Sequence, residues 1–305
     1  MIAAKSILGA GFRTDRIPTV GAEIHLSHSD GRGKPPLLLL HGYPETHAMW
    51  HKVAAELAAR FHVVCPDLRG YGDSSKPDTD ERHAPYSKRA MAQDMVEVME
   101  ALGYREFAVA GHDRGARVTH RLCLDHAERV SRACVMDITP TYHMYETADR
   151  EFATTYFHWF FLIQPHPFPE RLLEPVAEYY LRSRLLRWGA HHATAFAPHI
   201  VDEYLRCFCD PAAIHASCED YRAAATIDME HDAADLGRNK VQCPLLVLWG
   251  ARGFVGKHYD VLGVWREWAA QTQQVEGGAL DCGHFLAEEQ PEETLRRLLA
   301  FFARS

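Results

Sequence analysis

The chain has 305 residues, of which 47% are hydrophobic and 24% are charged, and its formal net charge is −8. This length and balance predict a globular protein with a large core, most simply one α/β domain that carries an insertion, and they exclude disordered and collagen-like chains. The acidic charge and the lack of a basic stripe argue against a nucleic-acid surface.

Apolar runs predict the strands of a sheet in chain order. They lie at Phe12–Pro18, Ala22–His28, Leu37–Leu40, Phe61–Cys65, Phe107–Ala110, Val130–Met136 and Leu245–Trp249. Helical patterns lie at Ala48–Ala59, Ser87–Leu102, Ala116–His126 and Pro291–Phe302. Because continuous apolar strands alternate with helices, we expect the α/β class, a mostly parallel sheet with helices on both faces.

Between residues 141 and 232 the pattern changes to helices alone. This segment is rich in aromatic residues, histidine and arginine, and prolines interrupt it. We interpret it as a helical cap inserted into a core domain formed by residues 1–140 and 233–305. Ligands of open α/β sheets bind beyond the carboxyl ends of the strands, so the pocket is expected between the cap and the sheet.

Other features of the chain bear on its location and cofactors. The first 12 residues lack the marks of a secretory signal, and no apolar run is long enough to span a bilayer, so we expect a cytoplasmic protein. The eight cysteines form no C-x-x-C pair and are expected to be reduced thiols, most of them in the core. The histidines include no H-E-x-x-H motif, and His191 and His192 lack partner ligands at metal spacing. We therefore expect neither a metal nor an organic cofactor.

The most informative motif is an apolar strand that runs into the Gly-x-Asp-x-Gly turn at Gly111–Gly115. Hydrolases usually carry serine at the position of Asp113. An aspartate, with a reference pKa of about 3.9, is already an anion at neutral pH and suits displacement at a saturated carbon. Asp113 could instead simply cap the following helix, but the strand–turn context favours a nucleophile.

Three further groups follow predicted strands or precede the last helix: His41–Pro44, Asp137 and His284. Nucleophile, acid and histidine then follow one another in the chain order of the α/β-hydrolases. The segment after the next strand, Trp249–Gly253, holds no carboxylate, which favours Asp137 as the acid. In this arrangement the backbone N–H groups of Tyr43 and Arg114 form the oxyanion hole.

Arg114 and Arg117 lie three residues apart at the start of a predicted helix and can share a face beside Asp113. Two guanidinium forks there would bind a substrate carboxylate and offset its repulsion by the anionic nucleophile. A neutral haloalkane would not need them. The alternative is that both are ordinary surface arginines.

The sequence resembles known families over nearly its whole length. The motifs His41–Pro44, Asp67–Ser74 and Gly111–Gly115 resemble the haloalkane dehalogenase and epoxide hydrolase branch of the α/β-hydrolases. The segments Gly111–Arg117, His158–Trp159 and Asp220–Ala223 are similar to the fluoroacetate dehalogenases, which hydrolyse haloacetates.

The resemblance implies that His158, Trp159 and Tyr221 bind the halide, since a ring N–H, an indole N–H and a hydroxyl can replace the water around fluoride. It also implies Trp188 as a secondary pocket residue and a homodimeric assembly. Aromatic core packing is the alternative reading of His158, Trp159 and Trp188.

Together these features predict a hydrolytic dehalogenase that converts fluoroacetate to glycolate and fluoride. Asp113 forms an ester, and water activated by His284, with Asp137 holding the imidazole, hydrolyses it. The closest alternative is an epoxide hydrolase, which needs two cap tyrosines. Tyr142, Tyr145, Tyr156 and Tyr221 are available for that role. An alternative of another class is a ligand-binding receptor that has lost turnover, and the sequence leaves the preferred halogen and chain length open.

Overall fold

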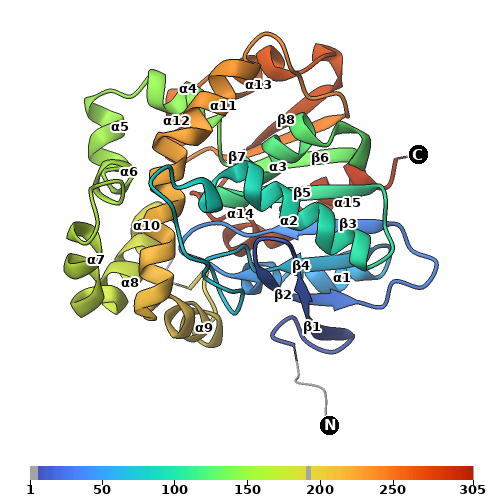
Figure 1. The fold of residues 1–305 in the computed structure, drawn as a ribbon. Coiled ribbons are helices and arrows are strands. Elements are labelled where there is room, and N and C mark those ends of the chain that lie inside the picture. The colour runs from blue at the N-terminus through green and yellow to red at the C-terminus, as the bar shows by residue number, and fades with distance from the viewer. Residues whose placement is uncertain (1–5, 190–193, 305) are drawn as a thin grey trace.

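The computed structural model describes residues 6–189 and 194–304, so His191 and His192 lie outside the described residues. Within these ranges one eight-stranded sheet crosses the molecule (Figure 1). Its strands are β1 (Phe12–Pro18), β2 (Glu23–Ser29), β3 (Pro36–Leu40), β4 (His62–Pro66), β5 (Phe107–His112), β6 (Val130–Met136), β7 (Leu245–Gly250) and β8 (Val275–Leu280).

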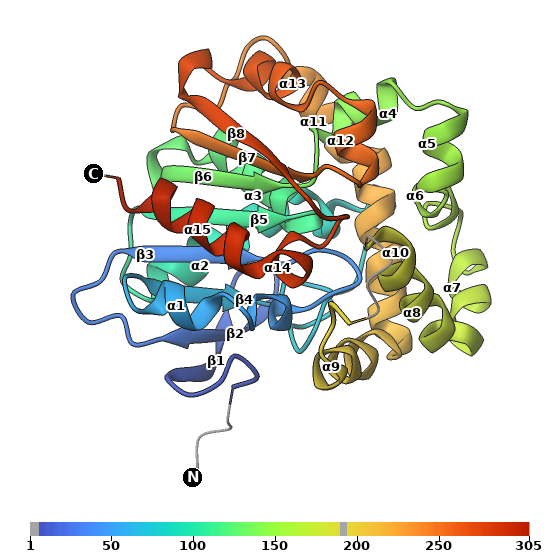
Figure 2. The same ribbon diagram turned by 180° about the vertical axis from the view of Figure 1, so that it is seen from behind.

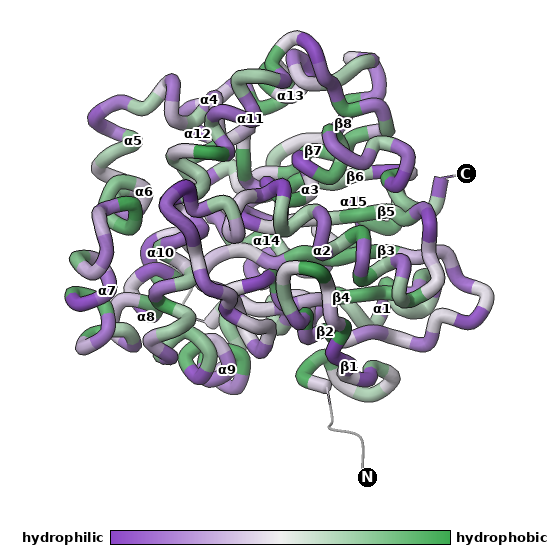
Figure 3. Tube along the Cα trace, viewed as in Figure 1, coloured by the Kyte–Doolittle hydropathy of each residue, from purple (hydrophilic) through white to green (hydrophobic). Residues whose placement is uncertain are grey.

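The sheet has the strand order β1-β2-β4-β3-β5-β6-β7-β8. All neighbours from β4 to β8 pair in parallel, whereas β2 pairs antiparallel with both β1 and β4. Leu37–Leu40 of β3 pair with β5 at the centre of the sheet and are fully buried, and Figure 3 shows the apolar character of these two strands. The predicted α/β class is confirmed.

Helices cover both faces of the sheet. In the core they are α1 (Ala54–Ala58), α2 (Lys88–Ala101), α3 (Arg114–Asp125), α12 (Phe254–His258), α13 (Val261–Trp268), α14 (Leu286–Glu289) and α15 (Pro291–Phe302). Helices α2 and α3 lie against the face seen in Figure 1, and α1 and α15 lie against the face seen in Figure 2. The apolar strands are thereby shielded from water on both sides.

A second group of helices lies between β6 and β7 in the chain. They are α4 (Thr141–Glu146), α5 (Arg150–Thr155), α6 (His158–Phe161), α7 (Phe168–Leu173), α8 (Ala177–Trp188), α9 (Pro198–Phe208), α10 (Pro211–Ala225) and α11 (Ile227–Asp235). Figures 1 and 2 show α5 to α10 beyond one end of the sheet, the end at which β3, β5 and β6 finish. The predicted all-helical pattern is thus found, and its last helix extends past residue 232 to Asp235.

Two core segments differ from the prediction. The helix expected at Ala48–Ala59 is divided into a 3-10 turn, η1 (His47–Trp50), and the short helix α1. Strand β8 was not predicted, because its sequence VEGGAL combines two glycines with a glutamate, which are poor strand formers. Its pairing with β7 along the whole of Leu245–Gly250 overrides that local preference.

The structure bears on the expectations about membrane spans and cysteines. In the described part of the chain, no helix has the length and apolar character needed to cross a membrane. All eight cysteines are free, and six are buried as expected, whereas Cys209 is exposed and Cys243 is half-buried.

Candidate active site

Asp113 lies at the turn between β5 and α3, with a backbone φ of 45° and ψ of −113°. A positive φ is strained for any residue other than glycine, and such strain is found most often at functional sites. The turn packs tightly against the end of β3, because the Gly115 N–H donates to the His41 carbonyl at 2.9 Å. A Cβ on Gly115 would lie 2.5 Å from that same oxygen, so this position of the motif requires glycine.

The helices inserted between β6 and β7 are called the cap helices, or the cap, from here on. The Asp113 carboxylate is buried where the end of β5 meets them. Its Oδ2 accepts a hydrogen bond from the Tyr43 backbone N–H at 3.0 Å. Burial by itself would raise the pKa of Asp113, but electrostatic interactions with the neighbouring His284, Arg117 and Arg114 outweigh it and hold the pKa below the ordinary value. The carboxylate is therefore an anion at neutral pH.

His284 and Asp137 form a hydrogen-bonded pair, in which Asp137 directly follows β6 and His284 lies in the segment after β8, two strands away. His284 Nδ1 donates to Asp137 Oδ2 at 2.6 Å, and the Gly250 N–H donates to the other oxygen of Asp137 at 2.9 Å. The His284 backbone N–H in turn donates to the carbonyl of Trp188 at the end of α8. Strand β7 and the cap thus fix this pair, and Nε2 is the ring nitrogen left to face a ligand.

A buried pair behind the nucleophile was not among the predicted site residues. The Nδ1 of His112 lies 3.1 Å from Glu45 Oε2, and its Nε2 donates to the His284 carbonyl at 2.8 Å. Burial opposes a charge on His112, but its contact with Glu45 prevails and raises the pKa of His112 to about 9. The sequence pointed to this pair only through its position in the chain. Glu45 directly follows the His41–Pro44 motif, and His112 lies within the Gly111–Gly115 motif.

Arg114 is fully buried and already engaged by a carboxylate. Its Nε and Nη2 donate to the two oxygens of Asp220 on α10 at 2.8 and 2.7 Å. Lys88 also pairs with Asp220, and the Tyr71 hydroxyl donates to it at 2.6 Å. Asp220 therefore occupies the side of the guanidinium that was expected to bind the substrate carboxylate. Among the described residues, Nη1 of Arg114 has no partner.

Arg117 has neutral partners instead. Its Nη1 donates to the Thr139 carbonyl at 3.1 Å and to Thr141 Oγ1 at 3.0 Å, and Nη2 contacts Met144 Sδ at 3.1 Å. Within residues 6–189 and 194–304, Nε is unpaired and no carboxylate forms an ion pair with this side chain. Burial lowers the pKa of Arg117. The Asp113 carboxylate acts on this cation without bonding to it directly, so burial of the charge is only partly compensated, and an anion bound beside Arg117 would offset more of that cost.

The cap contributes the three predicted halide ligands, His158 and Trp159 from α6 and Tyr221 from α10, and all three are buried. The guanidinium of Arg114 lies 4.2 Å from the centre of the Tyr221 ring, and that of Arg117 lies 4.7 Å from the Trp159 ring. Burial holds the pKa of His158 well below its usual range, so the imidazole is neutral and has one N–H to donate. No described residue bonds to its Nδ1.

A small cavity between the cap and the sheet brings seven of the predicted residues together. Its walls are formed by Asp113, Arg117, Asp137, Met144, Tyr156, His158, Trp159, Trp188 and His284. Three predicted residues do not appear in this lining and are linked to it through their neighbours. Tyr43 is bonded to Asp113, Tyr221 packs 5.5 Å from the His158 ring, and Arg114 stacks on Tyr221. Two further wall residues are Met144, which was not predicted, and Tyr156, which was named only as a candidate tyrosine of the epoxide hydrolase alternative.

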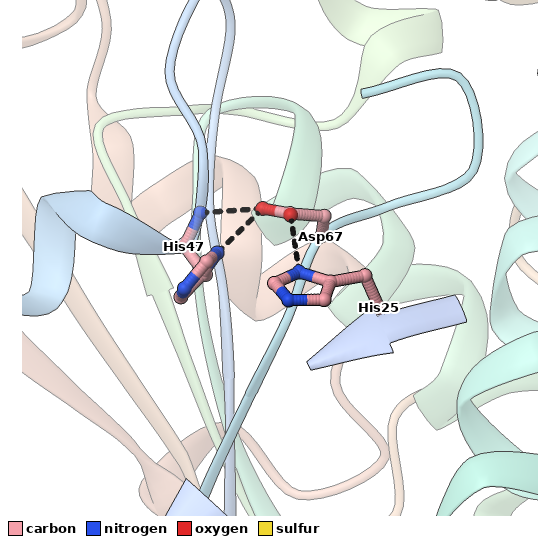
Figure 4. Close-up of side chains that lie close together, drawn as sticks. All are labelled: His25, His47 and Asp67. Carbon is pink, nitrogen blue, oxygen red and sulfur yellow. Dashed lines mark hydrogen bonds and ion pairs between the residues drawn. The ribbon is translucent and has the colours of Figure 1, made fainter. Parts of the chain in front are cut away.

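Two groups of side chains in the described residues have a composition that could suit a metal. They are His25, His47 and Asp67, and His166, Glu170 and His215. Figure 4 shows the first group, in which Asp67 accepts from His25 Nδ1 at 3.0 Å and from the His47 Nδ1 and N–H at 2.8 and 2.9 Å. In the second, Glu170 accepts from Arg222 Nη1 at 2.8 Å. Because each carboxylate already has charged or N–H partners, we assign both groups a structural role.

Comparisons with known proteins agree with this geometry. Residues 35–291 match the family model described as alpha/beta hydrolase fold. A fluoroacetate dehalogenase from Burkholderia sp is 46% identical over 90% of this chain and 88% of its own length. A soluble epoxide hydrolase from Corynebacterium sp. (strain C12) is 33% identical over 88% of this chain and 90% of its own length. The crystal structure of ALR0039 from Nostoc sp PCC 7120 is 55% identical, with a TM-score of 0.92 over 96% of this chain and 99% of that chain.

Proposed function

Since this chain belongs to the α/β-hydrolase fold family, we propose that it is a hydrolytic dehalogenase that cleaves the carbon–halogen bond of haloacetates, with fluoroacetate as the leading substrate. The similarity to the Burkholderia fluoroacetate dehalogenase supports this assignment, because it is higher than the similarity to the Corynebacterium epoxide hydrolase over nearly the same length.

The observation that carries the proposal is the state of Arg117. This guanidinium is buried, faces the cavity that Asp113 also lines, and has neutral partners among the described residues. A carboxylate on the substrate supplies the missing counter-charge. A neutral epoxide or haloalkane would leave the cation uncompensated.

In the first step one Asp113 carboxylate oxygen attacks the carbon that bears the halogen. The new carbon–oxygen bond forms as the carbon–halogen bond breaks, and the bonding electrons leave with the halide. Arg117 holds the substrate carboxylate, and the unpaired Nη1 of Arg114 adds a second donor. This anchoring places the carbon in line with Asp113 and screens the repulsion between two anions.

The departing fluoride must be stabilised as its charge develops. We assign this role to His158, Trp159 and Tyr221, whose N–H and O–H groups replace water around the ion. Removal of one such donor from a comparable anion site costs about 2.7 to 4 kcal/mol. Trp188 closes the same cavity as a secondary pocket residue.

In the second step water hydrolyses the ester. His284 takes a proton from the water, which adds to the carboxyl carbon of Asp113, and Asp137 stabilises the resulting imidazolium. The backbone N–H groups of Tyr43 and Arg114 stabilise the oxyanion, a role supported by the Tyr43 bond to the carboxylate. Collapse of the intermediate breaks its bond to the glycolate oxygen, which takes the proton from the His284 imidazolium, so that glycolate leaves and Asp113 and His284 are restored. No proposed step uses a metal or an organic cofactor.

The test combines product release with isotope transfer. The enzyme is expected to release fluoride from fluoroacetate at an ion-selective electrode, and Asp113→Asn is expected to abolish release. A single turnover in water labelled with heavy oxygen should place the label in the Asp113 side chain, as read by peptide mass spectrometry. An unlabelled Asp113 after turnover would contradict the ester mechanism.

The alternatives are separated in the same assay. An epoxide hydrolase would turn over styrene oxide and release no fluoride, and a receptor would bind fluoroacetate without turnover. The positions of Tyr156 and Tyr221, both buried near Asp113, keep the epoxide reaction worth measuring.

We further propose that residues 141–232 act as a cap on the core domain of residues 1–140 and 233–305, and that the enzyme is a cytoplasmic homodimer. Support for the dimer is a cap patch of exposed apolar side chains. It consists of Phe168, Leu172, Val176, Tyr179 and Leu186, each between 46% and 76% exposed. Several large exposed apolar side chains on successive elements of one region are a feature of interaction sites.

A further inference from the structure

A second and larger cavity adjoins the one that holds Asp113. Its volume is about 430 Å³, and it shares Tyr156, Trp188 and His284 with the inner cavity. We call it the vestibule. Because these three residues line both cavities, we interpret the vestibule as the space from which a small molecule reaches the reacting groups.

The vestibule is built where the cap meets the core. From the cap, helix α5 contributes Glu151 and Thr155, and the last turn of α8 contributes Arg187. The core contributes Arg252 and Lys257, the latter from α12. Figures 1 and 2 both show α12 next to the cap helices. Each of these cations is on an exposed residue at the rim, away from the buried groups that bind the substrate.

The rim cations are incompletely neutralised. Arg252 pairs with Asp281 at 3.1 Å, an exposed side chain outside the vestibule lining. In the described part of the chain, neither Arg187 nor Lys257 forms an ion pair with a carboxylate. Glu151 is the one carboxylate in the lining, and it already contacts His258 at 3.0 Å. Even with Asp281 counted, three cations face two carboxylates, so this mouth carries net positive charge.

The sign of this charge is opposite to that of the whole molecule, whose formal net charge is −8. A haloacetate is an anion, so the overall field repels it from most of the surface. Charges at a cleft mouth act over about one Debye length, roughly 8 to 10 Å in ordinary buffers, and can raise the capture rate of an ion of opposite sign.

We propose that the vestibule is the substrate entrance and that Arg187, Arg252 and Lys257 form an electrostatic funnel that captures small carboxylates and thereby contributes to selection for anionic substrates. This inference rests on the proposed haloacetate function. It adds a determinant of specificity at the mouth, distinct from Arg117, which holds the carboxylate at the reacting end.

The test is the salt dependence of kcat/KM for fluoroacetate. In Lys257→Glu and Arg187→Glu we expect kcat/KM to fall about threefold to tenfold at low salt, about 20 mM, and to approach the wild-type value at about 500 mM. The kcat is expected to stay within about twofold, because neither side chain touches the reacting atoms. Glu151→Gln should change kcat/KM in the opposite direction.

The matched control is Arg105→Glu, which makes the same charge change on an exposed arginine just before β5, at the opposite end of that strand from Asp113. It should leave kcat/KM unchanged at both salt concentrations. An equal effect of Arg105→Glu, a parallel fall in kcat and kcat/KM, or a loss that persists at high salt would each overturn the funnel.

A separate binding measurement distinguishes failure of the funnel from failure of the proposed function. Absence of fluoride release from the wild type would contradict the haloacetate reaction. The funnel is then judged by the association rate of fluoroacetate, followed through the fluorescence of Trp188, which lines both cavities, and Trp159, which lines the inner one. A lower association rate in Lys257→Glu supports the funnel, and an unchanged rate refutes it.

Discussion

Arg114 and Arg117 are chemically identical side chains with opposite relations to the folded chain. Arg114 is compensated by Asp220 and is part of the link between the core and α10. Among the described residues Arg117 donates only to neutral groups, and the Asp113 carboxylate compensates its charge without direct contact, so part of the cost of burying this cation remains until a ligand binds. At the scale of single residues, we therefore expect Arg117 to matter mainly for activity and Arg114 mainly for stability.

We expect Arg117→Met to lower kcat/KM for fluoroacetate about 100-fold, because it removes a charged partner of the substrate carboxylate. The same change should leave the free energy of unfolding nearly unchanged or higher, since it removes a buried cation that has no directly bonded carboxylate. Arg114→Met should lower the free energy of unfolding by about 3 to 5 kcal/mol, because it breaks a buried ion pair. Urea unfolding and fluoride release measure both effects, and equal destabilisation by the two changes would contradict the distinction.

The lowered pKa of Asp113 has a consequence for the first chemical step. Nearby cations hold it below the reference value of 3.8, so the charged form persists to lower pH than in an isolated aspartate. We expect the single-turnover rate of halide release to be flat from about pH 5 to about pH 8. A rate that declines steadily toward pH 5 in rapid-quench experiments would show that the nucleophile is protonated in this range.

At the scale of elements, the site lies where the ends of β3, β5, β6 and β7 meet the cap. The turn after β5 packs on β3 through Gly115, and Asp137 is tied to the end of β7. The buried contact of Glu45 with His112 connects the loop after β3 to the end of β5, and His112 continues to the His284 carbonyl. This contact holds three separate loops in one geometry.

Glu45→Gln tests that connection through its pH dependence. The pKa of His112 is raised from 6.5 to about 9, so its contribution to stability is complete below pH 6.5 and is lost as the pH rises through 9. Burial also raises the pKa of Glu45, and a raised pKa in the folded state lowers stability as the pH rises, which is the same direction as the effect of His112. We expect the free energy of unfolding of the wild type to fall by about 1 to 3 kcal/mol between pH 6.5 and pH 9.5.

In Glu45→Gln the free energy of unfolding should fall less between pH 6.5 and pH 9.5 than it does in the wild type. The variant should also be less stable than the wild type at pH 6.5. Glu56→Gln, at an exposed position on α1, is the matched control and should behave as the wild type. Urea unfolding followed by tryptophan fluorescence gives these values. A fall of equal size in Glu45→Gln would exclude His112 as its origin.

At the scale of the whole molecule, the outer face of the cap carries the exposed apolar patch on α7 and α8. Tyr179 is its most exposed member at 76%, and Glu178 and Arg182 form an ion pair beside it. A twofold axis through this patch would pair each apolar side chain with its own copy. The dimer we propose would then bury the patch.

We expect the wild type to have the mass of a dimer in size-exclusion chromatography with light scattering. Tyr179→Glu should shift it to the mass of a monomer, because a charge would be buried at the axis. Val20→Glu, at a 95% exposed position in the turn between β1 and β2, should leave the mass unchanged. A dimer that survives Tyr179→Glu would place the interface elsewhere.

Much of this protein could be predicted from its sequence, because the decisive signals are local. Apolar runs and helical periodicity identified seven of the eight strands and the helical segment, and the turn at Gly111–Gly115 pointed to Asp113. These signals depend on neighbours in the chain. The α/β class and the family are confirmed, whereas the roles of the individual site residues stay predictions.

Only the tertiary structure decided the electrostatics of the site. Nothing near Arg114 in the sequence indicates that Asp220, 106 positions away, occupies its guanidinium, while Arg117 is left with neutral partners. The contact of Glu45 with His112 and the positive mouth at α12 likewise join segments far apart in the chain. A side chain's type follows from the sequence, but its charge balance depends on which distant groups the fold brings within a few ångströms, where electrostatic energy is largest.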